Sequence, residues 1–300
     1  MSVVIQERVS ASRAAWGACL MSFLALLGML WWTRTRIELS VAVSVFLPGT
    51  AFALLHAAYT WVRPVPKISA LTGALAVLFL SSFASVLMAV ASLRSGAPLI
   101  DPLLAGADAA LGLDTQALVL ATAEWPRLGR LLRGAYLMTV PAVLLAIGIL
   151  AIVEQTDRMW EATFAFAASA AFCSFSMSFL PAVAAFAYYG TDVDPRPAYE
   201  AVIALYRSGA VDTIQLSHLA GVGTFPSFHA TMAAIVIFGL RRIPVLSVLS
   251  WIWGGLVLIA TVSFGGHYAI DLPAGVALFA LSVCLVRARP IRSAAPQSAA

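Results

Sequence analysis

Charged side chains are scarce in this sequence. They make up 11% of its 300 residues, against about a quarter in an average soluble domain. So little charge argues against a soluble globular protein, and the arginines form no run that would indicate a nucleic-acid partner. Hydrophobic residues make up 61% instead, and they recur in runs long enough to cross a bilayer. The sequence therefore predicts an all-α, polytopic transmembrane helix bundle that contacts the membrane bilayer and binds no nucleic acid.

Cysteine is also rare, and each of the three cysteines lies inside an apolar run. Cys19, Cys173 and Cys284 have no motif partner, which argues against a disulfide framework, a cysteine metal site or thiol chemistry. The acidic residues, for their part, match no tight metal-binding loop. We therefore predict no metal and no cofactor. Nothing in the sequence indicates the oligomeric state.

The apolar runs predict about eight transmembrane helices, and an even number places both termini on the same side of the membrane. The short loop with Arg241 and Arg242, and the exit at Arg287, favour the cytoplasmic side for the termini. We expect an integral protein of a bacterial inner (cell) membrane, with its active site facing the outer side. The predicted spans are roughly residues 14–32, 39–62, 70–93, 132–153, 163–188, 226–240, 245–262 and 268–286.

Four parts follow from this arrangement of spans. Residues 1–93 hold two extra spans and the first core span, and residues 94–131 form short interfacial helices on the outer side. Residues 132–286 hold the remaining core spans. Residues 287–300 are small and polar, and we expect a disordered cytoplasmic tail there.

Histidine is rare as well, with four in the chain, and two of these stand beside small residues. One lies in GTFPSFHATM, which begins at Gly223, and the other in SFGGHYAIDL, which begins at Ser263. His229 starts the sixth predicted span and His267 the eighth. Alternate spans start on the same side of a membrane, so we expect the two histidines to share the outer face.

The first of these stretches has the features of an anion site at the start of a helix. Pro226 suits a first helical turn, whose free N–H groups and dipole favour an anion. Ser227 adds a hydroxyl donor, and His229 lies in the same turn, where it can donate or accept a proton. We predict that Ser227 binds phosphate and that His229 is the general acid and base.

The second stretch predicts a histidine activated by a carboxylate. Gly266 lets the backbone approach a ligand closely, which makes it a further candidate for binding phosphate. Asp271 follows His267 by four residues, so on a helix the two side chains would share a face. A carboxylate on one imidazole nitrogen makes the other a better nucleophile. We therefore predict that His267 attacks phosphorus and forms a phosphohistidine, with Asp271 as its partner.

The two stretches, FPSFH followed by SFGGHYAIDLPAG, resemble motifs of the type 2 phosphatidic acid phosphatase superfamily. The resemblance covers about residues 95–285 and is nearest to the inositolphosphotransferase-related branch. It implies a six-helix core with a site at the membrane surface, two added N-terminal helices, and a lipid phosphate as substrate. Ser227 and His229 match the middle motif, and His267 and Asp271 match the last.

The sequence departs from the family pattern where two phosphate-binding cations are expected. Thr261 stands in place of the family's arginine, and Tyr189 in place of its lysine, whereas Arg196 and the following proline match. We predict that Arg196 first, and then Arg207, supply the positive charge that phosphate needs.

Three functions stay open at this point. The main interpretation is a metal-independent lipid-phosphate phosphatase or lipid headgroup phosphotransferase, because both reactions share the same first step. An aspartate and a histidine within the membrane would also suit a proton-coupled transporter. The missing lysine and arginine would suit a catalytically inactive relative of the family.

Overall fold

The computed structural model describes residues 2–190, 197–219, 223 and 225–288. Most of these residues are helical and very few lie in strands, which confirms the predicted all-α class. The sheet among them is a single parallel pair of two-residue strands, β1 (Arg36–Ile37) and β2 (Thr213–Ile214).

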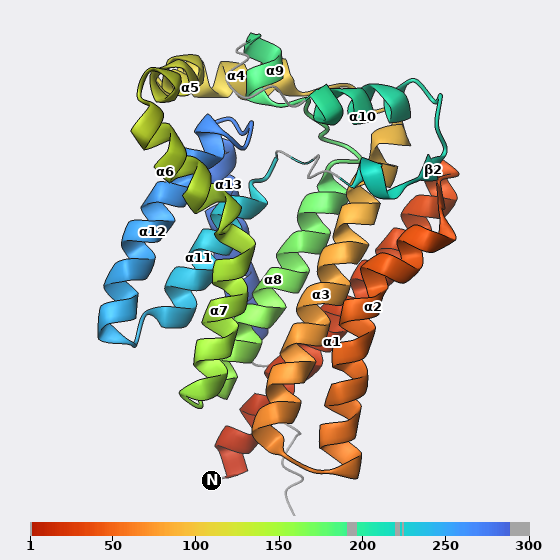
Figure 1. Ribbon diagram of the computed structural model, residues 1–300, viewed down its shortest axis with the longest axis vertical. Coiled ribbons are helices and arrows are strands. Elements are labelled where there is room, and N and C mark those ends of the chain that lie inside the picture. The colour runs from red at the N-terminus through yellow and green to blue at the C-terminus, as the bar shows by residue number, and fades with distance from the viewer. Residues whose placement is uncertain (1, 191–196, 220–222, 224, 289–300) are drawn as a thin grey trace, which may run out of the picture.

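Long helices run side by side through the molecule, and short helices lie across one end of the bundle (Figure 1). The short ones are α4 (Asp101–Ala110), α5 (Thr115–Glu124), α9 (Ala185–Tyr189) and α10 (Pro197–Arg207). The long ones are α1 (Ser2–Thr33), α2 (Leu39–Ala57) with the π-helical turn Ala58–Val62, α3 (Pro66–Ser92), α6 (Pro126–Leu137), α7 (Thr139–Ile152), α8 (Thr156–Ser176), α11 (Phe228–Leu240), α12 (Pro244–Ser263) and α13 (Asp271–Arg287).

Among the described residues, four helices are long and apolar enough to cross a membrane. The number rises to six when two bent pairs, α4 with α5 and α6 with α7, are each counted as one span. These helices fit an integral membrane protein, as predicted. The count is lower than the eight spans expected, partly because α11 and α13 have 13 and 17 residues, fewer than the ~20 that a bilayer takes.

Two predicted spans have different boundaries in the structure. The span expected at 163–188 ends at Ser176, because the chain turns before Pro181, which cannot continue a helix. The span expected at 132–153 is two helices, α6 and α7, bent by 52°. Residues 94–131 do contain the short helices that were predicted there, α4 and α5 and the start of α6.

The hydrophobic core joins the N-terminal helices to the later ones. One cluster contains Ala15 of α1, Leu78 of α3, Ile147 of α7, Phe166 of α8 and Ile235 of α11, all buried. Small residues on α1 and α8 let these helices approach closely, as is common between membrane helices. The core therefore crosses the boundary expected at residue 93.

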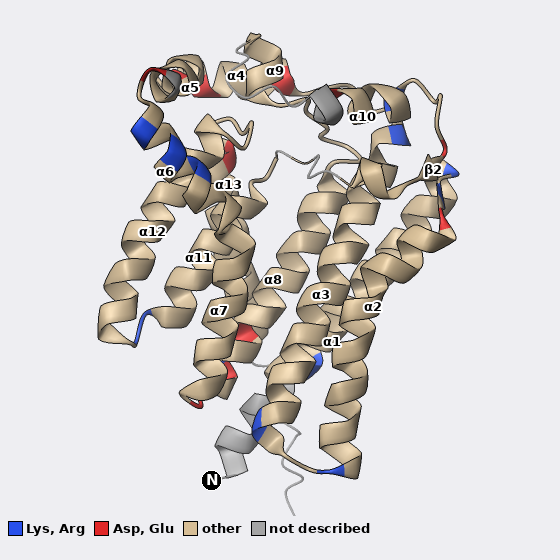
Figure 2. Ribbon diagram, in the orientation of Figure 1, with Lys and Arg blue, Asp and Glu red and all other residues tan. Residues whose placement is uncertain are grey.

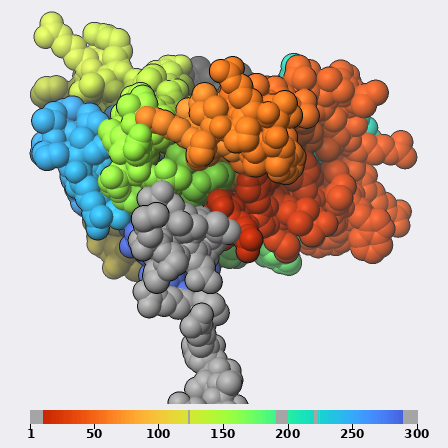
Figure 3. Space-filling view, turned by 90° about the horizontal axis from the view of Figure 1, so that it is seen from below, coloured from red at the N-terminus to blue at the C-terminus, as the bar shows by residue number. Residues whose placement is uncertain are grey.

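The connections α2–α3, α7–α8 and α11–α12 all lie at the end of the bundle opposite α4 and α5 (Figures 1 and 3). Basic residues occur beside these connections, among them Arg63, Lys67, Arg241 and Arg242, as Figure 2 shows by colour. Basic residues also occur at the opposite end, on α6 and beside β2, so the cytoplasmic placement of this end stays a prediction.

The orientation can be tested with single cysteines in a variant whose three native cysteines are replaced by alanine. Asp114 and Gln155 are both exposed, at opposite ends of the bundle. We expect Asp114→Cys to react with an impermeant maleimide in intact cells, and Gln155→Cys to react only after permeabilisation. The reverse pattern would show that the predicted orientation is inverted.

Candidate active site

The two histidines singled out in the sequence lie beside each other in the structure. His229 is the second residue of α11, and His267 lies in the loop between α12 and α13. Their ring centroids are 6.0 Å apart, and the planes of the rings meet at 69°. The structure thus brings together the two stretches, as expected.

His267 is held by Asp271 in a buried pair. Its Nδ1 lies 3.1 Å from Oδ2 of Asp271, and the two side chains are 2% and 0% exposed. The same Oδ2 accepts the backbone N–H of Tyr268 at 3.0 Å. A proton on Nδ1 that points at a carboxylate leaves the lone pair on Nε2, which is the form of imidazole that can attack phosphorus.

The contact between His267 and Asp271 was predicted for the wrong reason. The two residues do not share a helix face, because α13 begins at Asp271 and His267 lies in the preceding loop. The carboxylate of Asp271 instead reaches back from the first helical residue. This start also explains Pro273, because a proline within a first helical turn gives up no intrahelical hydrogen bond.

Ser227 links the two histidine stretches. It is fully buried and caps α11, where its Oγ accepts the N–H of Ala230 at 3.2 Å. Its own backbone N–H donates to the carbonyl of Asp271 at 3.1 Å. Ser227 is therefore the N-cap, and Pro226 stands before the cap rather than inside the first turn. Binding of phosphate by the Ser227 hydroxyl, whose proton the cap does not use, stays a prediction.

Two glycines allow the elements of the site to meet. Gly266 has φ +73°, its carbonyl accepts the N–H of Ala185 at 2.8 Å, and a Cβ there would lie 2.5 Å from the ring of Phe186. Gly275 lets α13 touch the backbone of Ser227, where a Cβ would collide with the Ser227 carbonyl. The packing of Gly266 against residues 184–186 accounts for glycine at that position, and its role toward phosphate stays a prediction.

Tyr136 is a member of the site that the sequence did not indicate. This residue of α6 stacks on His229, with centroids 4.2 Å apart and an angle of 19° between the rings. It also approaches Gly265, where a Cβ would lie 2.9 Å from its ring. Tyr136 therefore restricts the position of the His229 imidazole. No motif surrounds it, and only the packing of α6 against α12 brings it here.

A profile of the PAP2 superfamily matches residues 102–285, which is more than half of the chain and includes both histidine stretches. The chain belongs to the PAP2 superfamily. No curated protein and no solved structure matches it. Membership of the PAP2 superfamily supports a phosphatase-type enzyme, and it agrees with the buried His267–Asp271 pair beside His229.

Of the two arginines predicted to bind phosphate in this PAP2 member, Arg207 lies within the described residues, where it binds the loop before α4. Nη2 of Arg207 donates to the carbonyl of Ala97 at 3.0 Å, beside the loop that precedes α4. Arg196 lies outside the described residues. Their proposed roles stay predictions. Arg133, by contrast, is exposed on α6 one turn before Tyr136, which stacks on His229.

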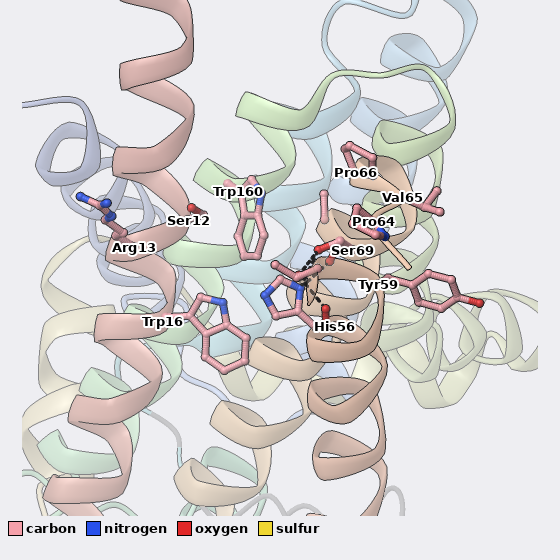
Figure 4. Close-up of a pocket in the computed structure, with 12 residues that line it drawn as sticks. Ser12, Arg13, Trp16, His56, Tyr59, Pro64, Val65, Pro66, Ser69 and Trp160 are labelled. Carbon is pink, nitrogen blue, oxygen red and sulfur yellow. Dashed lines mark hydrogen bonds between the residues drawn. The ribbon is translucent and has the colours of Figure 1, made fainter. Parts of the chain in front are cut away.

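A cavity of about 540 Å³, drawn in Figure 4, lies beside the α2–α3 connection, at the end of the bundle opposite α4 and α5. Its lining includes His56, whose Nδ1 donates to the carbonyl of Ser69 at 2.7 Å and whose ring stacks 5.7 Å from Trp16. His56 thus joins α2 to α3 and packs on α1. Among the described residues, no three His, Cys, Asp or Glu side chains gather where they could hold a metal ion.

Proposed function

We propose that this protein is a metal-independent phosphatase or headgroup phosphotransferase that acts on a lipid phosphate through a phosphohistidine. The observation that supports it is the buried imidazole of His267, which binds Asp271 through Nδ1 and has the ring of His229 6.0 Å away. Membership of the PAP2 superfamily is consistent with this proposal.

The first half of the proposed reaction transfers the phosphoryl group to the enzyme. Nε2 of His267 attacks phosphorus, and the bond between phosphorus and the ester oxygen breaks. His229, protonated at the start, gives its proton to the leaving oxygen as general acid. The carboxylate of Asp271 stabilises the positive charge that develops on the His267 ring.

The second half returns the enzyme to its starting state. His229, now neutral, takes a proton from water or from an alcohol, and the resulting oxygen attacks the phosphohistidine. The N–P bond breaks, and either inorganic phosphate or a new phosphate ester leaves. Hydrolysis and headgroup transfer therefore use the same residues and differ in the acceptor.

A lipid substrate suits the position of these residues. The histidines lie at one end of long apolar helices, where a headgroup could meet the site while its hydrocarbon chains stay in the bilayer. Large apolar side chains are exposed on the same end of the molecule, among them Leu103 and Trp125, each 67% exposed. We propose that the site lies at the outer surface of a bacterial inner membrane, and that the protein belongs with the inositolphosphotransferase-related branch.

The acceptor can be identified with purified protein in nanodiscs that contain phosphatidic acid. We expect phosphate release from the wild type, and formation of a new phosphate ester when a polyol is added. Release without transfer identifies a phosphatase, and transfer identifies a phosphotransferase. If neither product forms with any lipid phosphate, the protein is an inactive relative and the proposed function is wrong.

The proposed reaction also needs positively charged side chains that bind the phosphate. We propose that Arg133 serves this purpose together with Arg196, because Tyr136 brings α6 against His229. A hydrogen bond to a charged group contributes about 1.5–3 kcal/mol, and such contacts matter most where charge develops in the transition state.

Alanine at either Arg133 or Arg196 is expected to lower kcat/KM about tenfold or more. Lysine should restore part of this loss, because a point charge lacks the paired donors of a guanidinium. Arg207→Ala is measured beside them, and a comparable loss there would support the earlier prediction for Arg207. Normal steady-state kinetics on phosphatidic acid in all three alanine variants would show that none of these arginines binds the phosphate.

A further inference from the structure

Two carboxylates of the surface helix α4 bind the loop that carries His267. Asp108 is fully buried and accepts three hydrogen bonds. Two come from the backbone N–H groups of Ala269 and Ile270, at 2.9 and 2.8 Å. The third comes from the hydroxyl of Thr115, at 2.5 Å. Ala269 and Ile270 lie between His267 and Asp271, so Asp108 holds the backbone of the segment that joins the catalytic pair.

Asp101 makes a second attachment to the same loop. It lies two turns before Asp108 on α4, is 2% exposed, and accepts the hydroxyl of Tyr268 at 2.9 Å. Burial, and then the charge of Asp101, raise the pKa of Tyr268, so the phenol keeps its proton and stays a donor. Asp101 also accepts the N–H groups of Val183 and Ala184, at 2.9 and 3.3 Å.

The geometry of these bonds favours one conformation of the loop. The N–H group of Ile270 belongs to the N-cap of α13 and that of Ala269 lies just before it, at the end where a helix leaves its first donors without partners. A carboxylate at that position gains from the helix dipole as well. Because three consecutive residues, Tyr268, Ala269 and Ile270, are bound by carboxylates of α4, the distance between the His267 ring and the Asp271 carboxylate is set by α4 as well as by α13.

The burial of two carboxylates on α4 calls for a physical explanation. Burying a charge is costly unless it is paired or fully hydrogen-bonded, and buried ionic groups often add little to stability compared with apolar side chains. Apart from the Thr115 hydroxyl, the donors to the two α4 aspartates belong to residues 268–270 or to the segment 183–184.

We propose that Asp108 and Asp101 are positioning residues that hold His267 in its reactive orientation through the backbone of residues 268–270. This inference rests on the proposed function for its kinetic consequence, but the orientation of His267 can be measured without any activity. The aspartates touch neither substrate nor the reacting atoms, so their removal should change kcat and leave KM nearly unaltered.

The test compares Asp108→Asn with Asp114→Asn in the full chain in nanodiscs. Asp114 is the exposed cap of the neighbouring helix α5, where asparagine caps equally well. In Asp108→Asn, the side-chain amide presents a donor to an N–H group and breaks at least one of the two backbone bonds. We expect kcat on phosphatidic acid to fall about 10- to 100-fold in Asp108→Asn, with KM within about twofold, because small displacements of a reacting group have effects of this size. Asp114→Asn should match the wild type.

A second readout follows the His267 imidazole itself. The chain has four histidines, so the ¹⁵N signals of its imidazoles can be assigned with single His→Gln variants. In Asp108→Asn we expect the Nδ1 signal of His267 to move away from that of a hydrogen-bonded imidazole. The signals of His56, and of His218, which contacts Tyr206, should stay in place. A folded Asp108→Asn variant with normal kcat and an unchanged His267 signal would refute the proposal.

Two further outcomes remain decisive. If Asp108→Asn does not fold, Tyr268→Phe takes its place, because this variant removes only the hydroxyl that Asp101 accepts. It should lower kcat and shift the His267 signal in the same direction, and no change in either would count against positioning. If the wild type acts on no lipid phosphate, the proposed function is wrong, and the His267 signal alone decides whether α4 orients the imidazole.

Discussion

The His267→Ala variant is expected to lose all measurable turnover and to form no covalent phosphoenzyme. The reason is that the attacking atom, Nε2 of His267, is removed together with the imidazole that Asp271 binds. The measurement is transfer of ³²P from labelled phosphatidic acid, quenched in alkali because phosphohistidine is labile in acid.

The matched control for this variant is His56→Gln, at the opposite end of the bundle. His56 contacts Ser69 and Trp16 and not the active site, and glutamine retains a donor for the Ser69 carbonyl. This control should form the phosphoenzyme at the wild-type rate. Full activity in His267→Ala would show that the nucleophile is a different group.

The His229→Ala variant is expected to depend strongly on the leaving group. General acid catalysis contributes about 10²–10⁴-fold when the departing oxygen needs a proton. Phosphatidic acid, which releases a basic alkoxide, should therefore lose rate by about that factor. A long-chain nitrophenyl phosphate should lose far less in the phosphoenzyme-forming step, because a nitrophenolate departs without a proton.

Tyr136→Phe is the control for the surroundings of His229. Phenylalanine keeps the ring that stacks 4.2 Å from the imidazole, so the position of His229 is retained. We expect the two substrates to keep their wild-type ratio of rates in this variant. Equal losses on both substrates in His229→Ala would mean that His229 positions the phosphate and does not protonate the leaving group.

Several features of the site depend on local sequence, and these were predictable. Apolar runs of bilayer length indicate membrane helices because the interior of a bilayer offers no partner for backbone polar groups. Alternate helices begin on the same side, so His229 and His267 were expected at one end of the bundle, and their ring centroids are 6.0 Å apart. The pair of motifs also indicated the PAP2 superfamily, which the profile match confirms.

Helix boundaries were less well predicted, because local breaks in the backbone interrupt apolar segments. Pro181 and the bend at Met138 interrupt two apolar segments that were each predicted, from composition, to be one continuous helix. His267 and Asp271 meet because a carboxylate at the first residue of α13 reaches back over the loop, although a shared helix face had been expected. A spacing of four residues permits both arrangements, and only the position of the helix start distinguishes them.

By itself, the sequence determined that the protein is a helical membrane protein and that two histidines and an aspartate belong to one site. The tertiary structure decided what surrounds them. Asp108 meets Ala269 and Ile270, and Tyr136 meets His229, across sequence separations of about 90 to 160 residues. The hydrophobic periodicity of the sequence does not predict such contacts, because they arise from how whole helices pack. The orientation of His267 is therefore a property of the bundle, which places the carboxylates of α4 over the start of α13.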